Sequence, residues 1–348
     1  MKKVLFILLA VSALGFAAFE VNGDGSPADL TKIAVSARWW GMGRAGVALS
    51  DDSGALLLNP ASMAMAHSFE LSAMSTQVLG VTNYTLINSV IPLGDRSQAF
   101  GLSMLDENAG TIYATDGLDE YGHPLKGGKI DNRNSILSLG FASRVYIPGI
   151  IDDLYLGIMF KNYYKLLGEL TATSMTADLG MIYKLNNYLS FGLTARNAIQ
   201  SGINYSTSEG SNKETYDTDY VAGVAFSLLN NDLTLAVDQM TNEKFGRTYV
   251  GIEYWLANIV ALRTGMAENE MTLGMGLRYE FLQIDVGYRY QDAPLDNQAY
   301  FSVTLGDARR LFLQRPKIEI MENPQPNVQP SAQRNNSRVN TPEEIRIL

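Results

Sequence analysis

The chain has 348 residues and a formal net charge of -9, so it lacks the basic character that binding to nucleic acid requires. It has no cysteine, which excludes disulfides, thiol nucleophiles, thiolate metal sites and a lipid-bearing lipoprotein cysteine. Beyond the N-terminus no apolar run reaches the roughly 20 residues of a spanning helix, which excludes a helical membrane protein.

Residues 1–18 have the pattern of a secretory signal peptide. Lys2 and Lys3 precede an apolar run over residues 4–14, and the small residues Gly15 and Ala17 stand three and one positions before a cleavage point. Cleavage after residue 18 fits nearly as well. An uncleaved anchor helix is the alternative, but the apolar run is shorter than a membrane span.

The segment 19–68 contains a GxGxxG motif formed by Gly41, Gly43 and Gly46. A dinucleotide site would need a buried hydrophobic strand before the motif and a crossover helix after it. Residues 38–40 are instead an arginine and two tryptophans, and no crossover helix follows. We therefore reject nucleotide binding and expect these glycines to permit tight turns or close packing.

The run from Gly41 to Ala64 resembles the N-terminal signature of FadL-like outer-membrane barrels, especially the shorter PorV/PorQ-type members. The resemblance covers some 24 residues and rests on a glycine-rich turn, an acidic step and an Asn-Pro-Ala step. The residues that carry it are Gly41, Gly43, Gly46, Asp51, Asp52, Asn59, Pro60 and Ala61. In those families the segment forms a plug inside the barrel, which implies the same placement for residues 39–65. From the residues alone, Asn59-Pro60 also predicts a turn between two elements.

The hairpin at residues 272–290 shows the strand pattern most clearly, because large apolar residues alternate with glycines and charges. The apolar face of its first strand carries Leu273, Met275, Leu277 and Tyr279. The apolar face of its second strand carries Ile284, Val286, Tyr288 and Tyr290. On the polar face Arg278 is expected to lie opposite Asp285. Full charges on the polar face indicate a closed barrel with an apolar exterior and a polar lumen.

Fourteen strands are predicted from residue 69 onward. They span 69–78, 83–92, 98–105, 134–147, 154–167, 173–185, 189–198, 219–229, 233–240, 247–256, 259–267, 270–279, 282–290 and 298–305. The expected fold is all-β: an antiparallel transmembrane β-barrel of about 14 strands over residues 69–306, with a short N-terminal plug over 19–68. The 31 glycines and 18 tyrosines suit such a barrel. Residues 111–115 are a candidate for one more short strand.

The connections between these strands alternate between short and long. Short periplasmic turns and long external loops would give this pattern, with both ends of the strand series on the periplasmic side. In the long connection 106–133, which contains Asp116, Asp119 and Glu120, we predict a solvated acidic loop. A calcium loop is the alternative, although the EF-hand spacing is missing.

After residue 306 the alternation stops. Residues 307–348 are rich in proline, asparagine, glutamine and charge, with almost no aromatic residues. This composition predicts a flexible periplasmic tail, and residues 343–348 are a candidate docking segment within it.

Eight charged residues lie on the strand faces opposite to the apolar ones. They are Asp178, Arg196, Asp238, Glu253, Arg263, Arg278, Asp285 and Arg289. Charges in a membrane protein are retained where they face water or one another, so we expect them in the lumen, with Glu253 beside Arg263. A ladder that holds strand register is the expected role, and selective binding is the alternative.

No motif favours an enzyme. A serine hydrolase would need a nucleophile elbow and a histidine base, and the two histidines, His67 and His123, are not part of such a motif. No HExxH, paired-cysteine or phosphate-loop motif occurs, so we expect neither a metal nor a cofactor.

The family resemblance implies two functions. FadL-like barrels take up hydrophobic small molecules, which bind near the plug and leave sideways through the wall, and this function is our expectation. The alternatives are a PorV/PorQ-like scaffold or shuttle in protein secretion and a secreted soluble β-protein. The expected location is the outer membrane. Its expected partners are membrane lipid together with a hydrophobic ligand or secretion-system proteins.

Overall fold

The computed structural model describes residues 29–33, 35–49, 51–78, 80–94, 97–110, 112–147, 151–206, 214–291 and 297–306. The predicted signal peptide (1–18) and tail (307–348) lie outside these residues. No helix within the described ranges is long and apolar enough to cross a membrane.

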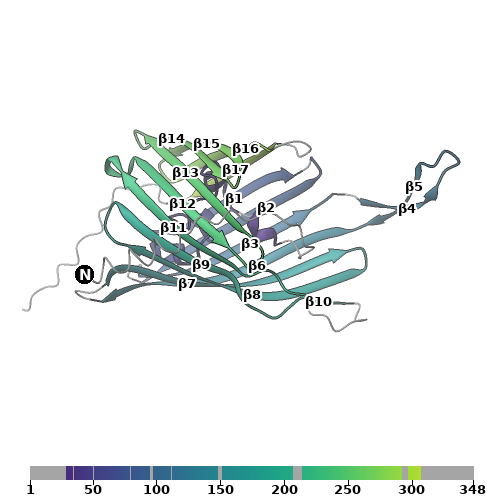
Figure 1. The fold of residues 1–348 in the computed structure, drawn as a ribbon, viewed down its shortest axis with the longest axis horizontal. Coiled ribbons are helices and arrows are strands. Elements are labelled where there is room, and N and C mark those ends of the chain that lie inside the picture. The colour runs from purple at the N-terminus through teal and green to yellow at the C-terminus, as the bar shows by residue number, and fades with distance from the viewer. Residues whose placement is uncertain are drawn as a thin grey trace, which may run out of the picture. The chain divides into compact units, whose positions relative to one another are not determined.

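Fourteen antiparallel strands close into a ring, as the sequence predicts (Figure 1). They are β1 (Glu70–Val78), β2 (Thr82–Leu93), β3 (Gln98–Asn108), β6 (Asn132–Ile147), β7 (Ile151–Leu167), β8 (Leu170–Lys184), β9 (Leu189–Gln200), β11 (Asp219–Leu228), β12 (Leu233–Thr241), β13 (Gly246–Leu256), β14 (Val260–Ala267), β15 (Glu270–Tyr279), β16 (Leu282–Arg289) and β17 (Gln298–Leu305). Each pairs with the next in this order, and β17 pairs with β1. The predicted strand ends differ from these by at most 3 residues.

The wall of the ring is apolar outside and polar inside. On β15 the side chains of Leu273 and Met275 are 42% and 49% exposed, whereas Arg278 on the other face is 7% exposed. The same alternation recurs around the ring. Outward-facing apolar residues include Ile87, Leu102, Leu139, Phe160, Leu193, Leu262 and Phe301. The predicted inside-out pattern is therefore confirmed.

The ring is irregular where β8 meets β9. Ala177 pairs with Ile199 and Leu179 pairs with Ala195, so three residues of β9 lie opposite Asp178 alone. Asn197, at the centre of this bulge, has a φ of 52°, a left-handed conformation that asparagine tolerates better than most residues. Bulges of this kind redirect side chains.

The connection between β3 and β6 is solvent-exposed, as predicted, but it forms a separate hairpin rather than a loop. β4 (Ile112–Leu118) and β5 (Pro124–Ile130) pair with each other outside the ring and project away from it (Figure 1). The candidate strand at residues 111–115 is confirmed by β4. The Asp119 carboxylate accepts hydrogen bonds from the backbone N–H groups of Tyr121 and His123, both at 2.8 Å, which closes the turn. The Lys126 ammonium lies 3.5 Å from the ring centroid of Tyr113. These local contacts explain why the segment forms strands despite its acidic composition.

The described residues between 29 and 66 (29–33, 35–49 and 51–66), here called the plug, lie inside the ring. They form η1 (Leu30–Lys32), α2 (Ala37–Gly41), η2 (Ser53–Ala55) and η3 (Pro60–Met65). α2 packs against β15 and β16, whereas η3 packs against β6 and β7 on another side of the ring. Two further short elements lie outside the plug: η4 (Leu229–Asn231) joins β11 to β12, and β10 (Asn204–Tyr205) pairs with β8.

Candidate functional site

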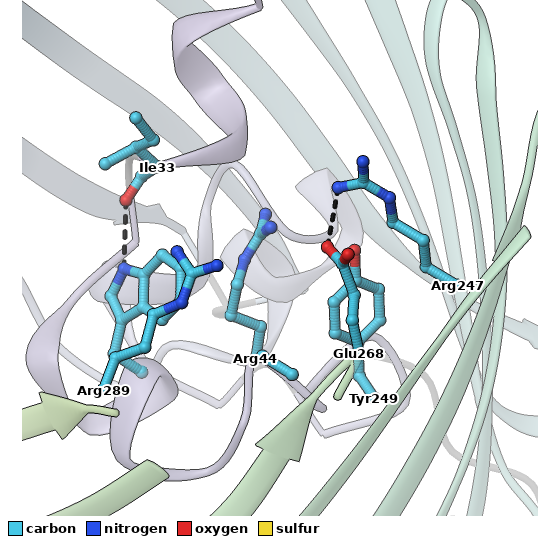
Figure 2. A pocket seen from close by; sticks show the side chains of 8 residues that line it. Ile33, Arg44, Arg247, Tyr249, Glu268 and Arg289 are labelled. Carbon is cyan, nitrogen blue, oxygen red and sulfur yellow. Dashed lines mark hydrogen bonds and ion pairs between the residues drawn. The ribbon is translucent and has the colours of Figure 1, made fainter. Parts of the chain in front are cut away.

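A cavity of about 120 Å³ lies between the plug and the wall, at the end of the ring where β13 begins and β14 ends. Arg44 and Trp40 of the plug line it together with Arg247 and Arg289 of the wall. Arg44 stands between Arg289 and Arg247 (Figure 2). Glu268, the one acidic residue of the lining, pairs with Arg247 at 2.6 Å. The lining is therefore predominantly cationic.

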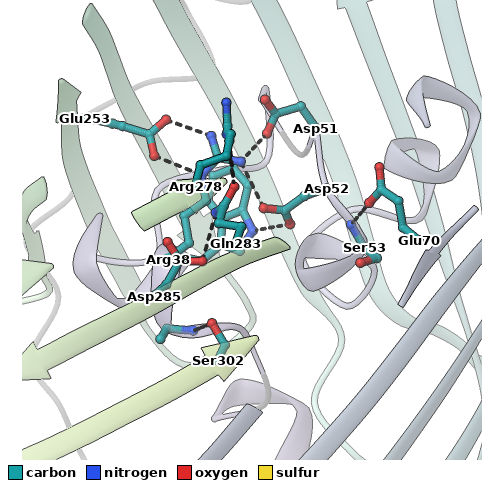
Figure 3. A network of polar contacts seen from close by, with 12 residues as sticks. Arg38, Asp51, Asp52, Ser53, Glu70, Glu253, Arg278, Gln283, Asp285 and Ser302 are labelled. Atoms are coloured by element: carbon teal, nitrogen blue, oxygen red, sulfur yellow. Dashed lines mark hydrogen bonds and ion pairs between the residues drawn. The ribbon is translucent and has the colours of Figure 1, made fainter. Parts of the chain in front are cut away.

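Arg38 joins the plug to the wall through a buried ion-pair network (Figure 3). Its Nη1 donates to Asp51 at 2.6 Å and to Asp52 at 2.9 Å, while Nε and Nη2 donate to the two oxygens of Glu253 at 2.9 and 2.7 Å. Asp52 also accepts from the indole N–H of Trp39 at 2.9 Å. Burial by itself lowers the pKa of Arg38, but Asp51, Glu253 and Asp52 raise it well above its ordinary value. The guanidinium is thus charged and fully matched by carboxylates.

The network continues along the wall from Glu253. Arg263 donates to Glu253 at 2.6 Å and to Asp285 at 2.8 Å. The predicted pairing of Arg278 with Asp285 is wrong, because the two-residue turn after β15 sets a register that places Arg278 opposite Gln283 and a glycine opposite Asp285. Gln283 links the two, since it accepts from Arg278 and donates to Asp285 at 2.8 Å.

Two further wall charges contact the plug backbone directly. Asp238 accepts hydrogen bonds from the N–H groups of Gly46 at 2.7 Å and Val47 at 2.9 Å. Arg196 donates to the carbonyl of Leu58 at 3.4 Å. Both contacts join residues more than 100 positions apart, so they fix the path of the plug across the lumen.

Asp29 is the centre of a second buried cluster, beside the β8–β9 bulge. Its carboxylate accepts from the Tyr163 hydroxyl at 3.1 Å and the Asn197 amide at 2.8 Å. Lys161 pairs with Asp178 at 2.8 Å, and Asp178 also accepts from the backbone N–H of Asn197 at 2.7 Å. Burial by itself raises the pKa of Asp29, but Lys161 and the neighbouring hydrogen bonds outweigh it and hold that pKa well below its usual range.

The Asn-Pro-Ala step begins η3. Asn59 is its N-cap, with the side-chain oxygen accepting from the N–H of Ala61 at 3.1 Å, and Pro60 occupies the first position. The Asn59 amide donates to the carbonyls of Val47 at 2.9 Å and Met181 at 3.1 Å. One side chain therefore holds a helix start, a distant part of the plug and the wall together.

Glycines allow the plug backbone to lie directly against the wall. A Cβ on Gly41 would stand 2.8 Å from the Cα of Gly274, and a Cβ on Gly43 would stand 2.5 Å from the backbone nitrogen of Met266. Gly43 also has a φ of +59°, which favours glycine. Other wall glycines touch the plug in the same way: Gly157, Gly180, Gly192, Gly251, Gly265 and Gly287.

The structure brings most of the predicted site residues together at the boundary between plug and wall. The eight residues that carry the family resemblance and the eight predicted lumen charges are buried, except Asp51 and Arg289, which are half-buried. Sequence reasoning missed Arg38 as a site residue, although Asp51 and Asp52 follow it at 13 and 14 positions. It also missed Asp29 and Arg44. Within the described ranges no three His, Cys, Asp or Glu side chains are placed to hold a metal ion.

The sequence profile of the type IX secretion system membrane protein PorP/SprF matches residues 53–305. The chain belongs to the PorP/SprF family. The match names this family rather than the expected PorV/PorQ type. No curated protein matches the chain at a significant level. Family membership and the inside-out ring place the protein in the outer membrane.

Solved structures of two toluene transporters share the fold. The Pseudomonas putida toluene transporter TodX is 13% identical, with 84% of this chain and 100% of that chain covered and a TM-score of 0.53. The Ralstonia pickettii toluene transporter TbuX is 12% identical, with 79% of this chain and 98% of that chain covered and a TM-score of 0.53. A Pseudomonas aeruginosa FadL homologue covers 84% of this chain and 100% of that chain at 13% identity, with a TM-score of 0.45. At such identities the TodX and TbuX likenesses show the fold alone, which agrees with the expected FadL-like barrel.

Proposed function

We propose that the protein is a closed outer-membrane scaffold of type IX secretion, which binds secretion-system or secreted proteins rather than passing small molecules through its lumen. The observation that carries this proposal is the plug. Arg38, Asp238 and Asn59 tie it to the wall through buried hydrogen bonds in three separate places. A passage along the lumen past the plug would require these contacts to open, and each leaves a buried charge or amide unsatisfied when it does.

The β4–β5 hairpin is the proposed protein-binding element. It stands outside the ring, and its exposed side chains include Tyr113, Leu118, Tyr121 and Leu125. Aromatic and apolar side chains on a projecting hairpin are typical of protein contacts. Since the strand series begins and ends at the opposite end of the ring, we place the hairpin at the cell surface and the tail, residues 307–348, in the periplasm.

Replacing residues 112–130 with a short turn tests this role. The ring should still assemble, because β3 and β6 pair directly up to Asn108 and Arg133. Secretion of a type IX substrate that depends on this protein should fall. A matched variant that replaces only the tip, residues 119–123, tests whether the turn or the two strands are needed for secretion. Undiminished secretion without the hairpin, in a correctly assembled barrel, would contradict the proposal.

Passage of hydrophobic small molecules is the second candidate, favoured by the shared fold with the toluene transporters. Toluene flux into vesicles containing the purified protein distinguishes the two. The scaffold proposal expects flux no higher than in empty vesicles, whereas flux that rises with protein content would establish a passage.

A further inference from the structure

The cavity between plug and wall has the size of a site for one small group. Its volume is about 120 Å³, whereas sites for drug-sized ligands occupy roughly 300–1,000 Å³. An acyl chain or a folded peptide would not fit within it. The composition of the lining therefore decides what the cavity accepts.

That lining carries an excess of positive charge. It contains three arginines, Arg44, Arg247 and Arg289, and a single carboxylate, Glu268. Arg247 is matched by Glu268 at 2.6 Å, and Arg289 is matched by Glu270, outside the lining. Arg44 has no ion-pair partner among the residues that the structure describes. In a chain with a net charge of -9, this local excess of cations stands out.

Arg44 is held in place although its charge is unmatched. It is 7% exposed, and its Nε–H has no hydrogen-bond partner within the described part of the chain. Its guanidinium lies over the rings of Trp40 at 5.3 Å and Tyr249 at 5.5 Å and points into the cavity (Figure 2). Its φ of 64° is left-handed, a conformation that arginine rarely adopts. Burial lowers the pKa of Arg44, as expected for a cation that lacks a counter-charge.

We propose that this cavity binds a small oxyanion, a phosphate or carboxylate group, on the guanidinium of Arg44. A planar guanidinium matches the geometry of an oxyanion, and the charge-assisted hydrogen bonds would satisfy a buried donor that the protein leaves open. Arg247 and Arg289 add to the attraction from the wall side. The same charges exclude metal cations and give no reason for a neutral hydrocarbon to bind. The proposal does not depend on the secretion role.

Titration calorimetry on the purified full chain in detergent tests the site, with inorganic phosphate and acetate as probes. The central variant is Arg44→Asn, because asparagine tolerates a left-handed φ. The better-bound probe should bind at least about 10-fold more weakly to this variant, the size expected for losing a charge-assisted hydrogen bond. The control is Arg133→Asn, which removes an exposed arginine outside the cavity and should leave binding unchanged.

A second variant covers the case in which Arg44→Asn does not assemble. Arg44→Lys keeps the charge but loses the planar fork, so binding should weaken by less than in the asparagine variant yet measurably. The proposal is overturned if the wild-type protein binds neither probe. It is also overturned if an assembled Arg44 variant binds both probes as tightly as the wild-type protein does.

A competition arm identifies the source of the group. Nanodiscs containing phosphatidic acid or, as the control, only phosphatidylcholine are compared for displacement of bound phosphate or acetate. Displacement by the phosphatidic acid discs alone assigns a lipid headgroup, and displacement by neither disc assigns a free anion. Both outcomes support an oxyanion site.

Discussion

Arg38 shares one guanidinium between two carboxylates of the plug and one of the wall, and its side chain is 4% exposed. Removing it takes the Arg38 cation away from Asp51 and Asp52 and leaves Glu253 with Arg263. We expect Arg38→Met to lower the free energy of unfolding by about 3–5 kcal/mol, the cost of breaking a buried pair. Urea unfolding of the detergent-solubilised protein, followed by tryptophan fluorescence, measures this.

The control for Arg38 is Arg133→Met. Arg133 pairs with Asp106 at 2.8 Å, but its side chain is 57% exposed, and exposed pairs contribute about 0–1 kcal/mol. If both variants lose the same free energy of unfolding, the Arg38 network does not stabilise the plug.

Gly43 and Gly80 form a matched pair for testing the close contact of plug and wall. Both have positive φ, 59° and 65°, but a Cβ would meet the wall only at Gly43. Alanine at either position adds roughly 1–2 kcal/mol of backbone strain. Gly43→Ala should add about 1–3 kcal/mol more from overpacking, measured by the same unfolding experiment. Similar stability in both alanine variants would show that the plug backbone does not touch β13 and β14.

At the scale of one strand, β15 allows the outward-facing assignment to be tested by depth. Met275 lies in the middle of the strand and is 49% exposed, whereas Tyr279 lies at its end and is 75% exposed. Arginine at the membrane midplane costs about 2–4 kcal/mol, but only about 0–1 near the interface. Met275→Arg should therefore impair folding into lipid vesicles far more than Tyr279→Arg. Equal folding yields would argue against a lipid-facing β15.

The elements differ in how far local sequence decides them. Most strands of the ring alternate with period 2, so their facing follows from a few neighbouring residues. β8 and β9 depart from this alternation beside the bulge. The β4–β5 hairpin lacks an alternation of buried and exposed residues, because every residue of its two strands is exposed or half-buried. Its strands depend on the turn at Asp119 and on contacts such as Lys126 over Tyr113, which composition does not reveal.

For the whole molecule, the plug should decide whether the lumen conducts ions. A ring of fourteen strands is wider than the eight-stranded barrels that their own side chains fill. The intact protein should conduct poorly in planar bilayers, and deleting residues 41–61 should open a larger conductance without preventing barrel assembly. Unchanged conductance in an assembled deletion variant would mean that the segment does not block the lumen.

The sequence by itself determined the strand number, the inside-out wall and the boundaries of the ring, because alternation and turn residues act over short distances. The register of β15 against β16 depended on a tight turn, which is why Arg278 was paired with the wrong residue. Only the tertiary structure decided what the buried charges contact. Arg38 meets Glu253 across 215 residues and Gly46 meets Asp238 across 192. Those partners follow from the path of the plug through the lumen, and that path depends on packing against wall glycines in many strands at once, which no local pattern encodes.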